Sequence, residues 1–126
     1  MERRAVVKRY NRDEPFRYTF GTPLEAVFQI IKVDDQLTET SNGKASIIDL
    51  SLEGIRLNAA LNFPDRPVQL AIWFVLNDKE FNFTGDVVWK KQSGTGYDYG
   101  LLLKVDDDDK NELITQLKTF AKEAMK

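Results

Sequence analysis

The segment from residue 47 to residue 57 carries the residues best suited to bind a ligand. It contains Asp49, Ser51 and Gly54 in the spacing D-x-S-x-x-G, between two runs of strand-forming residues. The Asp49 carboxylate accepts hydrogen bonds, the Ser51 hydroxyl both donates and accepts, and Gly54 lacks a Cβ, so a ligand can approach its backbone closely. The same residues also suit a turn in which Asp and Ser bond nearby backbone amides and Gly takes a positive φ. Both interpretations are open at this point.

The N-terminal segment is the second feature that points to a ligand, because it is basic while the rest of the chain is acidic. Residues 1–17 hold six Lys and Arg residues against three acidic ones, a local charge of +3, whereas the whole chain has a net charge of −2. The remaining residues therefore carry −5. A basic arm on an acidic body favours an anionic ligand held at the arm. A solvated basic tail is the alternative.

The composition excludes several kinds of site. The 126 residues include no Cys and no His, which excludes disulfides, thiolate and imidazole metal sites, cysteine nucleophiles and Ser-His-Asp triads. The loop Ser93–Gly96 is rich in Gly but lacks the Lys of a P-loop. We therefore expect a protein that is not an enzyme and has no metal and no cofactor. No apolar run reaches the ~18–20 residues that span a bilayer, so we expect no membrane span and a cytoplasmic location.

Short strands must position these residues. Between residues 16 and 105, apolar residues recur at every second position in runs such as 24–30 and 68–74, a period that is typical of strands. Turn-forming residues separate the runs at Ser41-Asn42-Gly43, Asn77-Asp78 and Ser93–Gly96. Six or seven strands at this spacing predict a closed antiparallel β-barrel, which leaves no exposed sheet edge.

The C-terminal segment changes to a helical period. Apolar residues such as Leu113, Leu117 and Phe120 predict one amphipathic helix over about 108–125, packed on the barrel. The run Asp106–Asp109 precedes it and can cap the free amides of the first turn. A Ca²⁺ or Mg²⁺ site is the other use of such carboxylates, but the spacing matches no EF-hand loop, which favours capping. We expect one domain over 1–126, with a basic arm 1–15, a barrel 16–105 and a C-terminal helix 106–126.

Taken in order, these features resemble the PilZ family, bacterial domains best known as receptors for cyclic di-GMP. Three pieces match: the Arg-rich segment Arg12–Arg17 before the first strand, the D-x-S-x-x-G segment, and Gly85–Trp89 followed by Gly96–Leu101. The resemblance covers nearly the whole chain, from about Arg12 to the terminal helix. It implies a mostly β fold, a six-stranded antiparallel PilZ-type β-barrel with one C-terminal α-helix, in agreement with the strand pattern.

The resemblance also implies a ligand site. Arg12 and Arg17 would bind cyclic di-GMP, and Asp49, Ser51 and Gly54 would form the barrel wall of the site. An Arg guanidinium donates to phosphate oxygens or to guanine O6 and N7, and an Asp carboxylate accepts hydrogen bonds from guanine N1 and N2. Binding would order the N-terminal arm over the barrel and present a new surface to a protein partner.

The arginine spacing departs from the family pattern. The family pair is R-x-x-x-R, whereas Arg12 and Arg17 are spaced R-x-x-x-x-R, with Asp13 where the first Arg is expected. An extended residue spans only ~3.3–3.6 Å, so a loop can absorb one extra residue. Arg9 is a further candidate, because the arm can fold back. The alternative is a degenerate PilZ-like module that no longer binds nucleotide and works only through protein contacts.

Aromatic residues and charge bear on the partners. Trp89 is a candidate to pack beside a base, although a barrel Trp is more often a core residue. We expect Phe63, Trp73 and Phe81 in the core, with a partner surface as the alternative where they are exposed. The family implies an unidentified protein effector in motility, exopolysaccharide synthesis or adhesion, and we expect a monomer or weak homodimer. The acidic body lacks the broad positive stripe that DNA or RNA binding needs.

Overall fold

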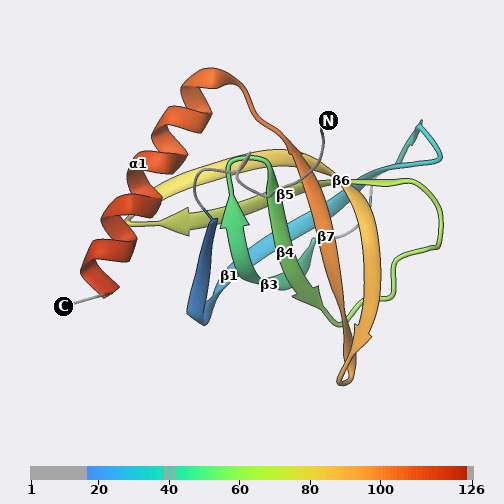
Figure 1. Cartoon of the computed structure of the whole chain (residues 1–126). Coiled ribbons are helices and arrows are strands. Elements are labelled where there is room, and N and C mark those ends of the chain that lie inside the picture. Colours follow the sequence, from blue (N-terminus) through green and yellow to red (C-terminus); the bar gives the residue numbers. More distant parts are fainter. Residues whose placement is uncertain (1–16, 39, 41, 125–126) are drawn as a thin grey trace, which may run out of the picture.

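The computed structural model describes residues 17–38, 40 and 42–124 and has strands followed by one helix (Figure 1). The elements are β1 (Arg17–Val33), β2 (Gln36–Leu37), β3 (Gly43–Ser51), β4 (Gly54–Ala59), β5 (Val68–Leu76), β6 (Lys79–Ser93), β7 (Gly96–Lys104) and α1 (Asp107–Ala124). The strands pair antiparallel in the order β1-β3-β4-β7-β6-β5, and β1 also pairs with β5, which closes the barrel. The predicted six-stranded antiparallel barrel with a C-terminal helix is confirmed, and the two-residue β2 is added to β1 as a hairpin.

The barrel interior is apolar and is filled by every second residue of the strands. The strand β5 shows the pattern most clearly, because Leu70 and Ile72 are fully buried while Val75 is 50% exposed. Phe63 and Phe81 are buried in the core, as the sequence predicts, whereas Trp73 is only partly buried. Burying a large apolar side chain contributes about 1.5–3 kcal/mol, so this interior fixes the barrel that carries the outer surface.

A one-residue bulge in β3 changes which side chains face outward. Ile47 pairs with Leu57 of β4 but Asp49 pairs with Arg56, so Ile48 is an extra residue in β3. Side chains alternate between the two faces of a strand, and an extra residue therefore moves those that follow to the opposite face. Ile47 points into the core. Strict alternation would point Asp49 into the core as well, but because of the bulge its side chain lies on the outer face of the barrel.

A second bulge, in β6, has the same effect on Trp89. Val87 pairs with Leu101 of β7 but Trp89 pairs with Gly100, which leaves Val88 as the extra residue. Trp89 is consequently 44% exposed on the outer surface. The expectation that this Trp belongs to the core is wrong, because strict alternation from Phe81 holds only up to the bulge.

The turns agree in part with the sequence. Asn77 and Asp78 have φ angles of 53° and 61° and join β5 to β6, as predicted for a two-residue hairpin turn. A second such turn lies at Asp34 and Asp35, with φ angles of 53° and 64°, where no turn was expected. Asp tolerates this left-handed conformation better than most residues. The turn predicted at Ser41-Asn42-Gly43 is not matched at Gly43, which already begins β3, and Ser41 lies outside the described residues.

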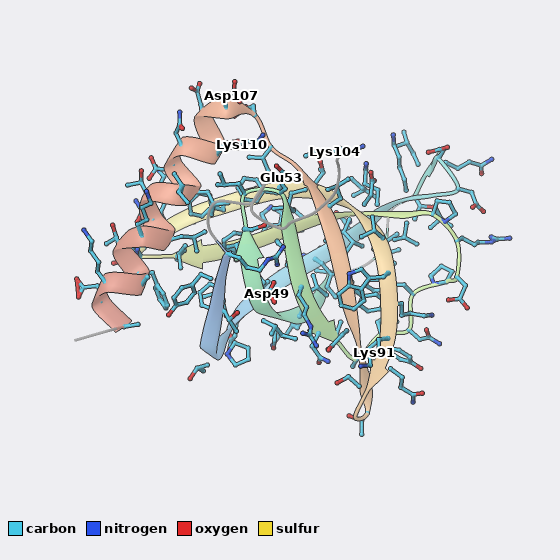
Figure 2. The ribbon with its side chains drawn as sticks, in the orientation of Figure 1. Asp49, Glu53, Lys91, Lys104, Asp107 and Lys110 are labelled. Atoms are coloured by element: carbon cyan, nitrogen blue, oxygen red, sulfur yellow. The ribbon has the colours of Figure 1, made fainter. Side chains whose placement is uncertain are left out.

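The helix α1 lies at one end of the barrel, beside the end of β5 and the start of β1 (Figure 1). The Asp106 carboxylate accepts a hydrogen bond of 2.8 Å from the Asp109 amide, which confirms the capping interpretation. Figure 2 shows the start of the helix, with Asp107 and Lys110 labelled. Phe120 packs edge-on against Tyr18 at 5.6 Å between ring centroids, which ties the helix to the start of β1. Within the part of the chain that the structure describes, no helix is both long enough and apolar enough to cross a membrane.

Candidate functional site

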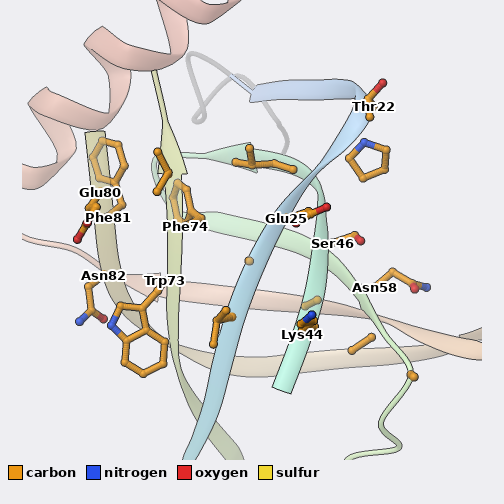
Figure 3. Close-up of a pocket in the computed structure, with 18 residues that line it drawn as sticks. Thr22, Glu25, Lys44, Ser46, Asn58, Trp73, Phe74, Glu80, Phe81 and Asn82 are labelled. Atoms are coloured by element: carbon orange, nitrogen blue, oxygen red, sulfur yellow. The ribbon is translucent and has the colours of Figure 1, made fainter. Parts of the chain in front are cut away.

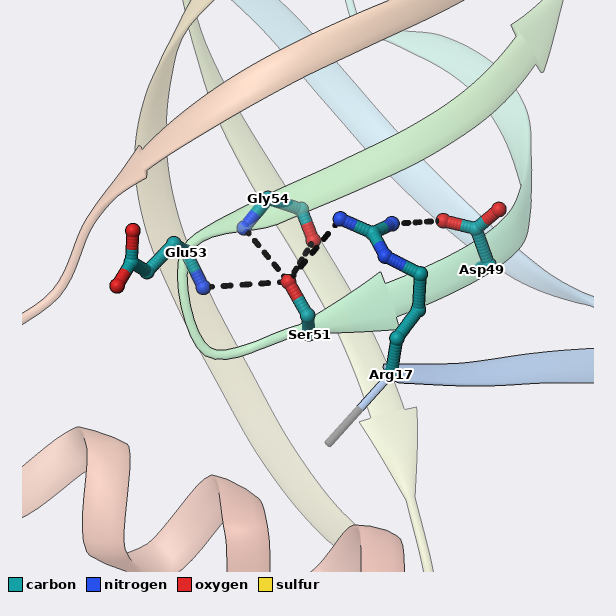
Figure 4. Close-up of polar contacts among 5 residues, drawn as sticks. All are labelled: Arg17, Asp49, Ser51, Glu53 and Gly54. Carbon is teal, nitrogen blue, oxygen red and sulfur yellow. Dashed lines mark hydrogen bonds and ion pairs between the residues drawn. The ribbon is translucent and has the colours of Figure 1, made fainter. Parts of the chain in front are cut away.

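Arg17 reaches from β1 to two residues of the D-x-S-x-x-G segment on β3 (Figure 4). Its Nη1 donates to Oδ1 of Asp49 in an ion pair, and its Nη2 lies 3.4 Å from Oγ of Ser51. These partners are 32 and 34 positions away in the sequence. They meet because β1 and β3 pair antiparallel, with Arg17 opposite Ser51 and Thr19 opposite Asp49.

Ser51 holds the turn between β3 and β4. It is fully buried, and its Oγ accepts hydrogen bonds from the backbone amides of Gly54 at 3.1 Å and Glu53 at 3.3 Å. This is the local bonding typical of Ser in turns, so the turn interpretation is correct for Ser51. The hydroxyl is also within reach of Arg17, which places it at the inner wall of the site.

Gly54 is explained by close approach and not by an unusual backbone angle. Among the described glycines a positive φ occurs at Gly94 and not at Gly54, so that part of the turn interpretation is wrong. A Cβ on Gly54 would lie 3.1 Å from the Leu101 carbonyl oxygen and 3.6 Å from Nη2 of Arg17. The missing Cβ therefore relieves a tight approach to the β7 backbone, whereas its contact with the guanidinium would be an ordinary van der Waals one.

The Arg17–Asp49 ion pair is accessible from solvent on one side. The Arg17 side chain is 40% exposed and the Asp49 side chain 13%. Ion pairs at exposed positions contribute only about 0–1 kcal/mol to stability, since water screens the charges and two side chains must be ordered. A ligand with stronger hydrogen-bonding groups can therefore replace this pair at small cost.

The polar surface continues from Asp49 across three more strands. Thr19, Asp49, Arg56, Gly100 and Trp89 are successive register partners on β1, β3, β4, β7 and β6. We call these five residues the outer row. Neighbouring strands are about 4.8 Å apart, so the backbone of Trp89 lies roughly 14 Å from that of Asp49 along the row. The structure thus brings Arg17, Asp49, Ser51 and Gly54 together and sets Trp89 at the far end of the same surface.

Trp89 lies flat over Gly100 and beside Arg56. A Cβ on Gly100 would be 1.9 Å from the indole Nε1, so that only Gly leaves space for the ring. The Arg56 guanidinium carbon is 6.0 Å from the centre of the Trp89 ring, at the outer limit of a cation–π contact. Sequence reasoning singled out Trp89 and missed Arg56, whose only sequence signal is its place two residues after Gly54.

A buried carboxylate on the same face of the sheet holds Arg56 from the side. Asp98, only 5% exposed, accepts hydrogen bonds from Nη2 of Arg56 at 2.9 Å and from Nδ2 of Asn58 at 2.8 Å. The hydrogen bond from Asn58, followed by the hydrogen bond and charge of Arg56, lowers the pKa of Asp98 below its ordinary value despite the opposing effect of burial. Asp98 is therefore anionic at neutral pH and fixes the guanidinium in one place.

A separate groove lies on another part of the barrel. Its volume is about 1120 Å³, and its walls include Glu25, Lys44, Trp73 and Asn82 (Figure 3). None of the predicted ligand-binding residues of the described chain lines it. Trp73, which the sequence placed in the core or on a partner surface, faces this groove.

The second arginine of the predicted site and a metal site are not part of the geometry described above. Arg12 and Arg9 lie outside the described residues, so the shifted arginine pair stays a prediction. Within residues 17–38, 40 and 42–124, no three Asp or Glu side chains gather in a way that would hold a metal ion. The chemistry available at the outer row and at its neighbours Arg17, Ser51 and Asp98 is hydrogen bonding and ion pairing.

Comparison with known proteins agrees with this arrangement. A family model described as "PilZ domain" matches residues 11–119. A solved structure described as the crystal structure of the PilZ domain of CeSA from a cellulose-synthesizing bacterium is similar in fold, with a TM-score of 0.53 and 16% sequence identity over 79% of this chain and 91% of that chain. The search of curated proteins gives no match.

Proposed function

The chain belongs to the PilZ domain family, and we propose that it is a receptor for cyclic di-GMP that acts as an adaptor and not as an enzyme. PilZ domains are binding and adaptor modules, generally for this nucleotide. The observation that carries the proposal is the meeting of Arg17, Asp49 and the buried Ser51 on one face of the barrel wall, with Arg17 more than 30 positions from the other two. Gly54 lies beside the guanidinium and completes the barrel wall of the proposed site.

The chemistry of these groups fits a guanine nucleotide. The ionised Asp49 carboxylate is an acceptor only, and guanine N1 and N2 are donors that it can bind. Arg17 offers a planar fork that matches phosphate oxygens or the O6 and N7 edge of guanine. A guanine that takes the Asp49 carboxylate displaces Arg17, and the released guanidinium is then positioned to bind a phosphate of the same ligand.

The N-terminal arm supplies the remaining positive charge in this proposal. Arg12, with Arg9 as a further candidate, would close over the ligand after Arg17 is released. Hydrogen bonds between guanidinium and phosphate are about twice as strong as neutral ones, so two arginines are sufficient to order a short segment. The ordered arm would form part of a surface for a protein effector, which we expect in the cytoplasm and in a process such as motility or exopolysaccharide synthesis.

Isothermal titration with cyclic di-GMP tests the proposal, with cyclic di-AMP and GTP as competing ligands. We expect saturable binding of cyclic di-GMP and a rise in melting temperature, because a ligand that binds only the folded state stabilises it. The variants Asp49→Ala and Arg17→Ala should each weaken binding by about tenfold or more, since each removes charge-assisted hydrogen bonds. Arg12→Ala tests whether the shifted spacing still supplies the second arginine.

Matched controls separate binding from general charge effects. Asp108→Ala removes the same charge from the exposed first turn of α1 and should leave the affinity unchanged. Absence of saturable binding with micromolar nucleotide would contradict the proposal. That result would favour the degenerate adaptor, a PilZ-like module that binds a protein partner without nucleotide.

A further inference from the structure

The outer row places a donor next to the acceptor that the proposed ligand uses. Asp49 and Arg56 are register partners on β3 and β4, and both side chains are on the outer surface. Side chains of residues that face each other across an antiparallel pair have Cβ atoms about 4.5–5.5 Å apart. The Arg56 side chain therefore leaves the sheet one strand spacing from Asp49, and its guanidinium lies toward β7 and β6, beside Asp98 and Trp89.

This pair matches one edge of guanine and not that of adenine. Along that edge guanine presents the N1 and N2 hydrogens as donors and O6 as an acceptor, whereas adenine has an N6 amino donor in place of O6. Asp49 can accept from N1 and N2 while Arg56 donates to O6. Adenine would place its amino group against the guanidinium, which carries donors only.

Arg56 is anchored by one charge-assisted hydrogen bond. Its Nη2 is hydrogen-bonded to Asp98 at 2.9 Å, and the Asp98 side chain is 7% exposed, whereas the Arg56 side chain remains 44% exposed. One edge of the guanidinium is therefore bonded to a neighbour on the same face of the sheet, while much of the side chain stays exposed. Trp89, seated over Gly100, closes the flank of the guanidinium away from Asp49.

We propose that Arg56 is a specificity-determining residue of the nucleotide site, which donates to the O6 oxygen of a guanine bound at Asp49. Asp98 is a positioning residue that holds the guanidinium in place, and Trp89 lies beside the guanidinium on β6. The inference rests on the proposed cyclic di-GMP site and extends it to β4, β6 and β7. The purely structural alternative is an Arg56–Asp98 pair that only joins β4 to β7.

The experiment measures the dissociation constants of cyclic di-GMP and cyclic di-AMP for the full chain by isothermal titration. In Arg56→Gln the affinity for cyclic di-GMP should fall about tenfold or more, while that for cyclic di-AMP stays within about twofold, since a base contact of this kind discriminates by that order. Arg56→Lys keeps the charge but loses the planar fork, and it should lose part of the selectivity. Asp98→Asn and Trp89→Leu should reduce the same ratio by smaller factors.

Arg66→Gln is the matched control, because Arg66 is an exposed arginine that pairs with Asp34 in the turn after β1, outside the outer row. An unchanged ratio of the two dissociation constants in Arg56→Gln overturns the inference and leaves the receptor proposal intact. Where Arg56→Gln does not fold, an unchanged ratio in Arg56→Lys has the same meaning. A wild-type chain that binds neither nucleotide overturns both the inference and the proposed function.

Discussion

The strands β5 and β6 are neighbours in the barrel but differ in regularity. They pair through eight successive residue pairs without a shift, from Gln69 with Asp86 to Leu76 with Lys79. In β5 every second side chain is buried along the whole strand. In β6 the same alternation ends at the Val88 bulge, beyond which Trp89 faces solvent.

Stability and polar surface groups come from different strands of this barrel. The regular strand fills the core, and the bulged strands β3 and β6 bring Asp49 and Trp89 to the outer surface. Bulges are common beside functional sites because they redirect a side chain without breaking the sheet.

A truncation in the regular strand should cost the most stability. Ile72 is fully buried in β5, and Ile72→Ala should lower the free energy of unfolding by about 2–5 kcal/mol, from lost burial and the cavity that remains. Urea unfolding followed by circular dichroism measures this change. On the same strand Val75→Ala, at a position 50% exposed, should change it by less than about 0.5 kcal/mol. Equal losses of unfolding free energy at the two positions would contradict the assignment of stability to the buried face of β5.

A single methyl group at the outer row should have the next largest effect. In Gly100→Ala the new Cβ occupies the place of the Trp89 indole, which must move away. We expect a loss of about 1–3 kcal/mol from overpacking and a red shift of the Trp fluorescence as the ring becomes more exposed. Gly21→Ala is the control, because no atom lies within 4 Å of its new Cβ. A Gly100→Ala protein with unchanged stability and fluorescence would show that the packing of Trp89 over Gly100 does not contribute to stability.

The smallest effect concerns pH and the support of Arg56. The pKa of Asp98 lies below its ordinary value of 3.8, chiefly because Asn58 donates a hydrogen bond to the carboxylate. A carboxylate with a lowered folded-state pKa stabilises the fold above the unfolded-state pKa, and this contribution is lost as the pH falls through the folded-state value. The difference in melting temperature between wild type and Asp98→Asn should therefore be full near pH 6 and shrink below about pH 4. A difference that stays constant down to about pH 2.5 would mean that the Asp98 charge is not involved.

The sequence predicts the regular parts of the molecule better than the irregular ones. Alternation identifies the buried residues of β5 and the Asn77–Asp78 turn, because each depends on residues close in the chain. Alternation gives the wrong face for Trp89, because Val88 is apolar like its neighbours and a Val residue does not by itself indicate a bulge. Arg56 was missed for a related reason, because its contact with Trp89 depends on strand register between distant segments. The meeting of Arg17 with Asp49 was expected only through the family resemblance.

The ion pair between Arg17 and Asp49 has a consequence for how the proposed receptor responds to dose. In the unliganded protein the guanidinium already occupies the acceptor that the base needs, so the chain carries its own competitor. The apparent dissociation constant is then the intrinsic one divided by the fraction of molecules in which the pair is open. Because a pair of this kind contributes only about 0–1 kcal/mol, the internal competition raises the apparent dissociation constant by about two- to sixfold. The contact therefore adjusts the dose at which the proposed receptor responds by a modest factor.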